Sequence, residues 1–282
     1  MSKKRDALGD RMKKYEYITR THLVPRMPIV IRLDGKAFHS FTRGFKRPFD
    51  EVLISTMQDT TKYLCENIQG CVLGYTQSDE ITLVLVDYKK LNSCAWFDNN
   101  IQKICSIAAS MATDAFKSIM LKRVYEMYGH KISDHDFLNW IIYGKPAGDI
   151  LAEDMAVTYL NAISKGAKFD CRTFNIPKEE VCNCVLWRQN DATRNSVEMV
   201  AQAHFSHGVL QNKSQSQMQD MLMLEKGINW NDFPVHQKRG SCCIKVQGDE
   251  DKRPKWIIDK NIPIFKGDGR KYIEDLVFVG EP

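Results

Sequence analysis

The chain has 282 residues, of which 43% are hydrophobic and 27% are charged, the composition of an ordinary soluble globular protein. This composition excludes an intrinsically disordered chain, a collagen-like chain and a small disulfide-rich scaffold. The net charge is only +5, but residues 1–47 carry 13 basic and 4 acidic side chains, which leaves −4 for the rest of the chain. A basic N-terminal arm of this kind fits a solvated terminus and a polyanionic partner equally well.

Nine cysteines are present, but neither Cys182-x-Cys184 nor the adjacent Cys242-Cys243 has the spacing of a zinc site. We expect most of them to be buried thiols in a reducing compartment. The first residues contain no apolar stretch typical of a secretion signal, and no run of about eighteen apolar residues occurs. The sequence therefore predicts a cytoplasmic protein that does not contact a membrane.

The N-terminal third of the chain predicts a helix, a strand and a second helix. The first helix is polar and covers residues 10–17. Residues 28–35 are nearly all apolar and predict a short buried strand that Gly35 ends. Apolar residues recur at helical spacing over 49–68, which indicates an amphipathic helix that crosses back over a sheet.

Two apolar runs follow, at 71–75 and 81–86, and the five polar residues between them are typical of a hairpin connection. The clearest helical pattern covers 98–119, with Asp98 as a good N-cap. Residues 169–176 predict a further strand. The resulting β-α-β-β-α-β order predicts an α+β, ferredoxin-like fold with an antiparallel sheet and helices on one face.

The remaining segments give weaker signals. Residues 131–165, with Gly144, Pro146 and Gly148, look like an insertion or a boundary between lobes. Residues 179–205 are predicted to be helical, and 211–217 form a polar loop. From residue 240 onward, short apolar runs between Lys, Asp, Gly and Pro predict a few strands and loops.

Two carboxylates fall where this topology brings strand ends together. Asp34 ends the first strand, and Asp79 lies in the tip of the hairpin. Two carboxylates close together repel each other unless a cation neutralises them, and oxygen ligands are what Mg²⁺ prefers. A pair of Mg²⁺ ions can activate an attacking hydroxyl and stabilise a leaving phosphate. Spacing alone, however, favours two ordinary solvated turns.

Residues near Asp34 add features suited to a nucleotide. Gly35 lets the backbone approach a phosphate or a metal, and Phe38 and His39 could flank a nucleobase. Arg47 follows shortly after, and Lys103 lies on the polar face of the predicted helix at 98–119. A triphosphate needs such cations. Each residue taken alone is more often a surface cation or a core aromatic.

Three runs of the sequence strongly resemble the tRNA-His guanylyltransferase family, the 3′-to-5′ nucleotide-adding polymerases, and the resemblance covers nearly the whole chain. The first two runs are long and specific in combination. They are Ile31-Arg-Leu-Asp34-Gly35-Lys-Ala-Phe38-His39-Ser-Phe41, Gly74-Tyr75-Thr-Gln77-Ser78-Asp79-Glu80 and Trp187-Arg188-Gln189-Asn-Asp191.

The resemblance implies a polymerase-like palm. Residues 1–135 would carry both metal carboxylates, and residues 136–282 would complete the palm and add RNA-binding elements. The two parts could form one compact domain. It implies two Mg²⁺ ions bound by Asp34, Asp79 and the carbonyl of Gly35. Arg47 and Lys103 match triphosphate-contacting positions. The residues that would hold the nucleotide are Asp34, Gly35, Lys36, Ala37, Phe38, His39, Ser78 and Asp79.

After Asp191, the sequence departs from the eukaryotic guanylyltransferases. Within residues 193–199, only Asn195 matches the run of residues that those enzymes have at this place. This departure resembles the guanylyltransferase-like branch found in bacteria and other lineages. For that branch, the resemblance implies template-directed repair of truncated tRNA 5′ ends. The residues expected to contact RNA, besides the basic arm, are Arg188, Arg194, Asn195 and Lys213.

The leading hypothesis is that the 3′-hydroxyl of an incoming nucleoside triphosphate attacks an activated 5′ end of tRNA. ATP, GTP and other NTPs would be substrates, and the family resemblance implies a homo-oligomer, often a tetramer. Two alternatives stay open. The chain could be a palm-fold nucleotide cyclase, although no Gly-Gly-Asp-Glu-Phe signature occurs, or a non-catalytic RNA-binding protein on a decayed palm, although neither metal carboxylate is lost.

Overall fold

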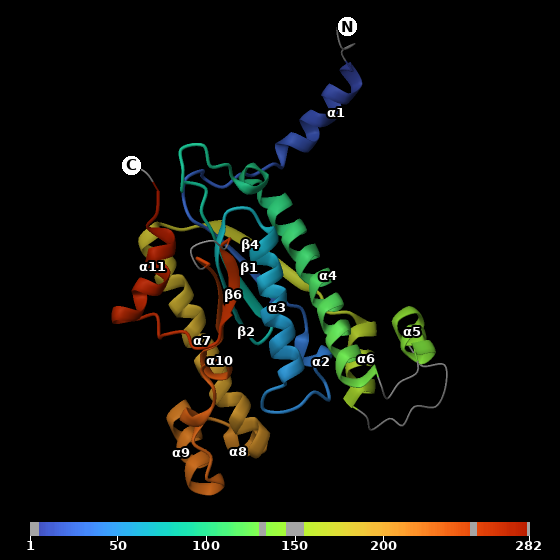
Figure 1. Cartoon of the computed structure of the whole chain (residues 1–282), viewed down its shortest axis with the longest axis vertical. Coiled ribbons are helices and arrows are strands. Elements are labelled where there is room, and N and C mark those ends of the chain that lie inside the picture. The colour runs from blue at the N-terminus through green and yellow to red at the C-terminus, as the bar shows by residue number, and fades with distance from the viewer. Residues whose placement is uncertain (1–5, 130–133, 145–154, 249–252, 281–282) are drawn as a thin grey trace.

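The computed structural model of the chain describes residues 6–129, 134–144, 155–248 and 253–280. These residues build an antiparallel six-stranded sheet with the strand order β4-β1-β3-β2-β5-β6 (Figure 1). The strands, in chain order, are β1 (Ile29–Gly35), β2 (Cys71–Gln77), β3 (Glu80–Leu85), β4 (Phe169–Asn175), β5 (Ser241–Val246) and β6 (Lys255–Asp259).

The first four strands and two long helices follow the predicted β-α-β-β-α-β order. Helix α3 (Glu51–Asn67) lies between β1 and β2 in the chain, and α4 (Ile101–Tyr128) lies between β3 and β4. Both helices share one core with alternate residues of β1, among them Ile31 and Leu33, which are fully buried. The ferredoxin-like α+β fold with an antiparallel sheet is therefore confirmed.

Residues after position 135 contribute to the same sheet, because β4, β5 and β6 all come from that part of the chain. The second face of the sheet is covered in part by α7 (Lys178–His204) and α11 (Lys271–Val277). Buried side chains of both helices, Val185 and Ile273, pack there with Tyr75 of β2. The sequence predicted α7, but it predicted only strands and loops where α11 forms.

The predicted insertion at 131–165 contains two described helices, α5 (Asp134–Tyr143) and α6 (Met155–Lys165). Helix α6 is an integral part of the main core, because Tyr159 and Leu160 are buried there. Residues 130–133 and 145–154 of this predicted insertion lie outside the described part of the chain.

A small helical region follows α7. Helix α8 (His207–Leu210) precedes α9 (Gln215–Lys226), and α10 (Val235–Arg239) leads into β5. Helix α9 begins inside the stretch that was predicted as a polar loop. Ser214 and Gln217 form a capping box in which each side chain bonds to the backbone N–H of the other residue.

Two local predictions were wrong by a few residues. The hairpin has a two-residue turn, Ser78-Asp79, because Gln77 and Glu80 still pair in the ladder. Helix α4 begins after Asn100, whose side-chain oxygen accepts a hydrogen bond from the Lys103 backbone N–H at 3.0 Å. Asp98 instead lies in a short 3₁₀ helix, η1 (Trp96–Asn99).

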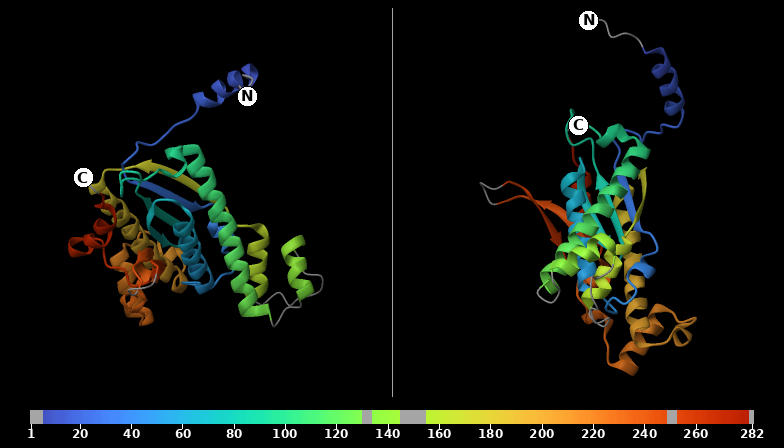
Figure 2. Two further views of the ribbon diagram at one scale, coloured as in Figure 1. Left: turned by 45° about the horizontal axis from the view of Figure 1, so that its top comes forward. Right: turned by 90° about the vertical axis from the view of Figure 1, so that its right-hand side faces the viewer.

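Helix α1 (Ala7–Ile18) carries part of the basic arm and has no buried residue. It projects away from the rest of the molecule in all three views (Figures 1 and 2). Its basic side chains, Arg11, Lys13 and Lys14, are all exposed. The arm is therefore accessible to a polyanionic partner.

Among the helices of the described residues, α4 alone is long and apolar enough to cross a membrane by length and composition. This is weak support for a membrane span, because core helices of soluble proteins pass the same test. Its buried residues, Ala108, Ala112 and Phe116, pack in the main core. All nine cysteines are free thiols; four are buried, four are half-buried and Cys94 is exposed.

Candidate active site

The end of β1 and the turn between β2 and β3 form the centre of the candidate site. Ile31 and Leu33 of β1 point into the helix-covered core, so the alternation of a strand directs Asp34 to the other face. Asp34 pairs in register with Glu80 of β3. The Gly35 N–H donates a hydrogen bond of 3.0 Å to the Asp79 carbonyl, which ties the two acidic segments together.

The charges of Asp34 and Asp79 interact. Burial raises the pKa of the Asp79 carboxyl, and the negative charge of Asp34 adds to the rise. Hydrogen bonds from the backbone and from the Ser78 side chain oppose it. A cation shared by two neighbouring carboxylates stabilises their charged forms. Two carboxylates and a backbone carbonyl form an oxygen donor set of the kind that Mg²⁺ prefers; within the described residues, no group of three or more His, Cys, Asp or Glu could hold a metal ion.

Two open cavities meet at this carboxylate pair. One, which we call the α2 cavity, lies against the short helix α2 (Phe38–Phe41) and the start of α3; the other, the α7 cavity, lies against the middle of α7. Each has a volume of about 580 Å³. Asp34, Ser78 and Asp79 line both cavities. Two ligands could therefore approach the same pair of carboxylates from different sides.

The α2 cavity contains most of the residues predicted to hold a nucleotide. Gly35, Ala37, His39 and Arg47 line it. Ala37, with φ of 55°, and Ser78, also with φ of 55°, both adopt the left-handed conformation that is unusual for residues other than Gly. Backbone strain of this kind concentrates at functional sites.

Phe38 lines the α2 cavity, but most of its ring is buried beneath the cavity wall. It is only 5% exposed and packs in an aromatic cluster, with ring centroids 5.7 Å from Phe116 and 5.3 Å from Phe169. The cluster also explains Gly35, because a Cβ at this position would lie 2.3 Å from the Phe38 ring. The residues that enclose most of the Phe38 ring come from α4 and β4, far away in the sequence, and its contact with a nucleobase stays a prediction.

Lys36 is not part of the wall of the α2 cavity. Its backbone N–H donates a hydrogen bond of 2.8 Å to the Lys168 carbonyl, and the residue is exposed. Lys46, which directly precedes Arg47, lines the α2 cavity and is exposed. The cations available to a triphosphate on this side are therefore Lys46 and Arg47.

Lys103 does not reach either cavity within this chain. Phe116 of α4 lies at the level of the site, because its ring contacts Phe38. Lys103 precedes Phe116 by 13 residues, which corresponds to about 20 Å along a helix. The Lys103 ammonium lies 6.0 Å from the Phe97 ring. Lys103 therefore lies away from both cavities, and its contact with a triphosphate stays a prediction.

Arg188 lines the α7 cavity, but its charge is engaged by two carboxylates of the chain, and its predicted contact with RNA phosphates stays a prediction. Its Nε lies 2.6 Å from Glu80 Oε1, and its Nη2 lies 2.6 Å from Asp191 Oδ2. The side chain is only 11% exposed. Arg188 therefore joins α7 to the start of β3 and neutralises the carboxylate next to Asp79. Burial raises the pKa of Glu80, and Arg188 opposes the rise.

The other predicted RNA contacts are exposed. Arg194 and Asn195 line the α7 cavity, and Arg194 also forms an ion pair with Asp191. Lys213 is exposed in the turn between α8 and α9 and lines neither cavity. Two of the predicted RNA contacts are thus at the carboxylate pair, and the third is away from it.

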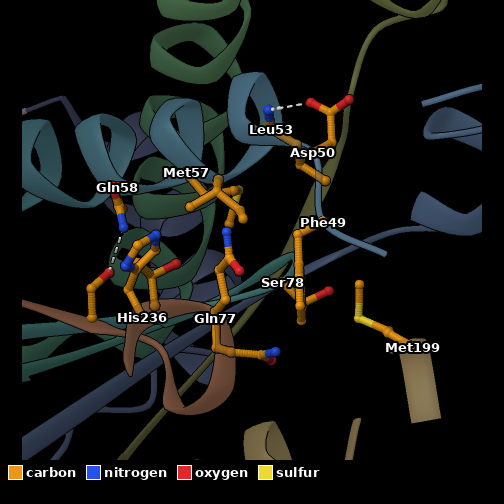
Figure 3. A pocket seen from close by; sticks show the side chains of 13 residues that line it. Phe49, Asp50, Leu53, Met57, Gln58, Gln77, Ser78, Met199 and His236 are labelled. Carbon is orange, nitrogen blue, oxygen red and sulfur yellow. Dashed lines mark hydrogen bonds between the residues drawn. The ribbon is translucent and has the colours of Figure 1, made fainter. Parts of the chain in front are cut away.

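A small third pocket, which sequence reasoning missed, adjoins the α2 cavity (Figure 3). Asp50 lines both; its carboxylate accepts hydrogen bonds from the Leu53 N–H at 2.9 Å and from the Tyr159 hydroxyl at 2.8 Å. His236 closes the other side, and burial lowers its pKa. The wall combines residues of α3, β2, α7 and α10, so no local sequence signal could have found it.

Comparisons with known proteins show the family of the chain. The family model of tRNAHis guanylyltransferase matches residues 9–177. A solved bacterial tRNA(His) guanylyltransferase (Thg1)-like protein in complex with ATP is 41% identical, with a TM-score of 0.78 over 97% of this chain and 100% of that chain. A second such structure, in complex with GTP, is 38% identical, with a TM-score of 0.75 over the same shares of both chains.

A more distant relative is a probable tRNA(His) guanylyltransferase of Dictyostelium discoideum. It is 25% identical over 285 residues, which cover 95% of this chain and 93% of the relative. The match of the family model to more than half of the chain confirms the resemblance stated above. The chain belongs to the tRNA-His guanylyltransferase family.

Proposed function

We propose that this chain is a 3′-to-5′ nucleotidyltransferase that adds nucleotides to the 5′ end of tRNA in a Mg²⁺-dependent reaction. The observation that carries the proposal is the meeting of two cavities at Asp34 and Asp79. A reaction that joins an incoming nucleotide to an RNA end needs two nucleotide sites at one reactive centre. Membership of the family and the ATP and GTP complexes of similar proteins support the same reaction.

Asp34, Asp79 and the Gly35 carbonyl are the oxygen donors that would hold two Mg²⁺ ions. When bound, such ions lower the barrier to attack by a hydroxyl and offset the charge of the leaving phosphate. The chain's own residues supply the remaining functions. Lys46 and Arg47 bind the triphosphate of the nucleotide in the α2 cavity, where exposed cations face the carboxylate pair.

Arg188 orients the site from the other side, because its ion pair with Glu80 holds the first residue of β3 directly after Asp79. Template choice comes from base pairing within the RNA, so the site needs few side chains that read bases. The tetrameric state and the cytoplasmic location stay predictions.

The direct test is extension of a tRNA that lacks its first nucleotide and carries a 5′-triphosphate, with labelled NTPs and Mg²⁺. We expect the missing nucleotide to be restored according to the opposite strand. No extension would contradict the proposal, and formation of a cyclic nucleotide without RNA would instead identify a cyclase. A panel of tRNA-His and other tRNAs, each lacking one to three 5′ nucleotides, separates repair of many tRNAs from guanylylation of tRNA-His.

A further inference from the structure

Trp187 is the exposed tryptophan of this chain. Its side chain lies on α7, is 51% exposed and forms part of the wall of the α7 cavity. Trp96, Trp140 and Trp230 are at most 9% exposed, and Trp256 is partly buried in the main core. A large apolar ring is thus held in solvent beside Asp34 and Asp79, where the proposed reaction takes place.

The indole is held in a fixed position by its neighbours. The Arg188 guanidinium carbon lies 4.2 Å from the centroid of the Trp187 ring, and that of Arg32 lies 5.8 Å away. Arg188 is itself anchored by Glu80 and Asp191. A ring ordered before binding loses little conformational entropy when a ligand stacks on it.

We propose that Trp187 is a stacking platform for the 5′-terminal nucleotide of the RNA substrate, which occupies the α7 cavity. The inference rests on the proposed function, which requires two nucleotides at the carboxylate pair. The α2 cavity carries the cations suited to the incoming triphosphate, Lys46 and Arg47. The α7 cavity remains for the RNA end, and stacking accepts any base because every base has an aromatic face.

The residues beyond Trp187 on α7 fit the same occupant. Arg194 follows Trp187 by seven residues, which places it on the same helix face about 10 Å further along. Its side chain is 56% exposed and lines the cavity together with Asn195. An arginine and an amide at this distance can contact the backbone phosphates of an RNA strand whose terminal base lies on Trp187.

The first test is tryptophan fluorescence, because four of the five tryptophans are buried or partly buried. A tRNA that lacks its first nucleotide and carries a 5′-triphosphate is titrated into the wild type and into Trp187→Phe. We expect quenching in the wild type that is absent in Trp187→Phe. Equal quenching in both proteins overturns the proposal. Equal quenching of the wild type by an NTP without RNA also overturns it, because the indole then contacts the incoming nucleotide.

The second test separates the two substrates kinetically. Loss of base stacking costs about 5- to 150-fold in affinity. Trp187→Ala should raise the RNA concentration for half-maximal extension by at least about fivefold, with the NTP dependence unchanged. Trp187→Phe should restore most of the loss, since Phe also stacks. Phe278→Ala, which removes a ring of equal exposure (51%) at the end of α11, serves as the matched control and should match the wild type.

The outcomes distinguish this inference from the proposed function. If the wild type does not extend the RNA, the proposed function fails, and the inference that rests on it fails too. If the wild type extends the RNA and Trp187→Ala shows the wild-type RNA dependence, the stacking platform is refuted while the function stands. Unfolding in urea checks that Trp187→Ala remains as stable as the wild type, so that a change in RNA dependence reports on the contact itself.

Discussion

Removal of the Arg188 guanidinium should destabilise the fold more than removal of an exposed arginine. Arg188 lies 2.6 Å from both Glu80 and Asp191, whose side chains are 20% and 25% exposed. Arg188→Met keeps the aliphatic length but leaves the half-buried Glu80 without its ion-pair partner, while Asp191 keeps its ion pair with Arg194. Breaking a buried ion pair costs about 3–5 kcal/mol. Because water still reaches both carboxylates, we expect a loss of about 2–3 kcal/mol in the free energy of unfolding.

The measurement is urea unfolding followed by circular dichroism, with Arg270→Met as the matched control. Arg270 pairs with Glu274 at 2.8 Å, and both side chains are about one-third exposed, so the control should lose only about 0.5–1 kcal/mol. Adding Glu80→Gln to Arg188→Met removes one stranded charge and should recover part of the loss. The reasoning is refuted if Arg188→Met loses no more stability than Arg270→Met.

The pH dependence of the same variant gives a second check. Burial already raises the pKa of Glu80, and Arg188 counteracts the rise. Without Arg188, the folded state holds the Glu80 proton more tightly than the unfolded state does. The stability deficit of Arg188→Met should therefore be small below the ordinary pKa of a glutamate and grow as the pH rises through the elevated pKa of Glu80. A deficit that is the same at all pH values would contradict this assignment.

Two further variants test the α2 cavity. Gly35→Ala should lose about 1–3 kcal/mol in the free energy of unfolding, because the new Cβ would lie 2.3 Å from the rigid Phe38 ring. Urea unfolding measures this loss, with Gly208→Ala as the control, because a Cβ at Gly208 meets no atom within 4 Å. An equal loss in both variants would contradict the prediction. Arg47→Ala should raise the KM for NTP about 10- to 100-fold, because it removes one charge-assisted hydrogen bond to the triphosphate. Steady-state kinetics measures the KM, with Arg43→Ala as the control, since Arg43 is exposed and lines neither cavity. A similar KM in both variants would contradict the prediction.

Local sequence patterns were sufficient for the central part of the fold. Strand β1 and the helices α3 and α4 have apolar residues at regular spacing, and this spacing is decided within each segment. The order of these elements in turn predicted that Asp34 and Asp79 lie near each other. The capping box at Ser214 and Gln217 was also readable locally, so α9 could have been predicted from that signal.

The remaining features depend on contacts between distant segments. From the sequence alone, Phe38 is expected to lie beside a nucleobase, but in the fold Phe116 and Phe169 enclose most of its ring. From the sequence alone, Arg188 is expected to be a free cation that binds RNA, but in the fold its Nε lies 2.6 Å from Glu80 Oε1. In both cases, a residue that the side chain contacts in the fold lies about 80 to more than 100 residues away in the sequence, so local patterns do not reveal the contact.

The most direct test of the central claim is the Mg²⁺-dependent extension of a 5′-truncated, triphosphorylated tRNA by the wild type, Asp34→Asn and Asp79→Asn. Asp170→Asn is the matched control, because Asp170 faces Asp34 across β1 and β4 but lines neither cavity. We expect the wild type and Asp170→Asn to extend the RNA, and both other variants to remain folded but inactive, since each replaces an anionic carboxylate ligand with a neutral amide and so removes a repelling charge from the fold. Activity in Asp34→Asn or Asp79→Asn close to that of the wild type would contradict the account.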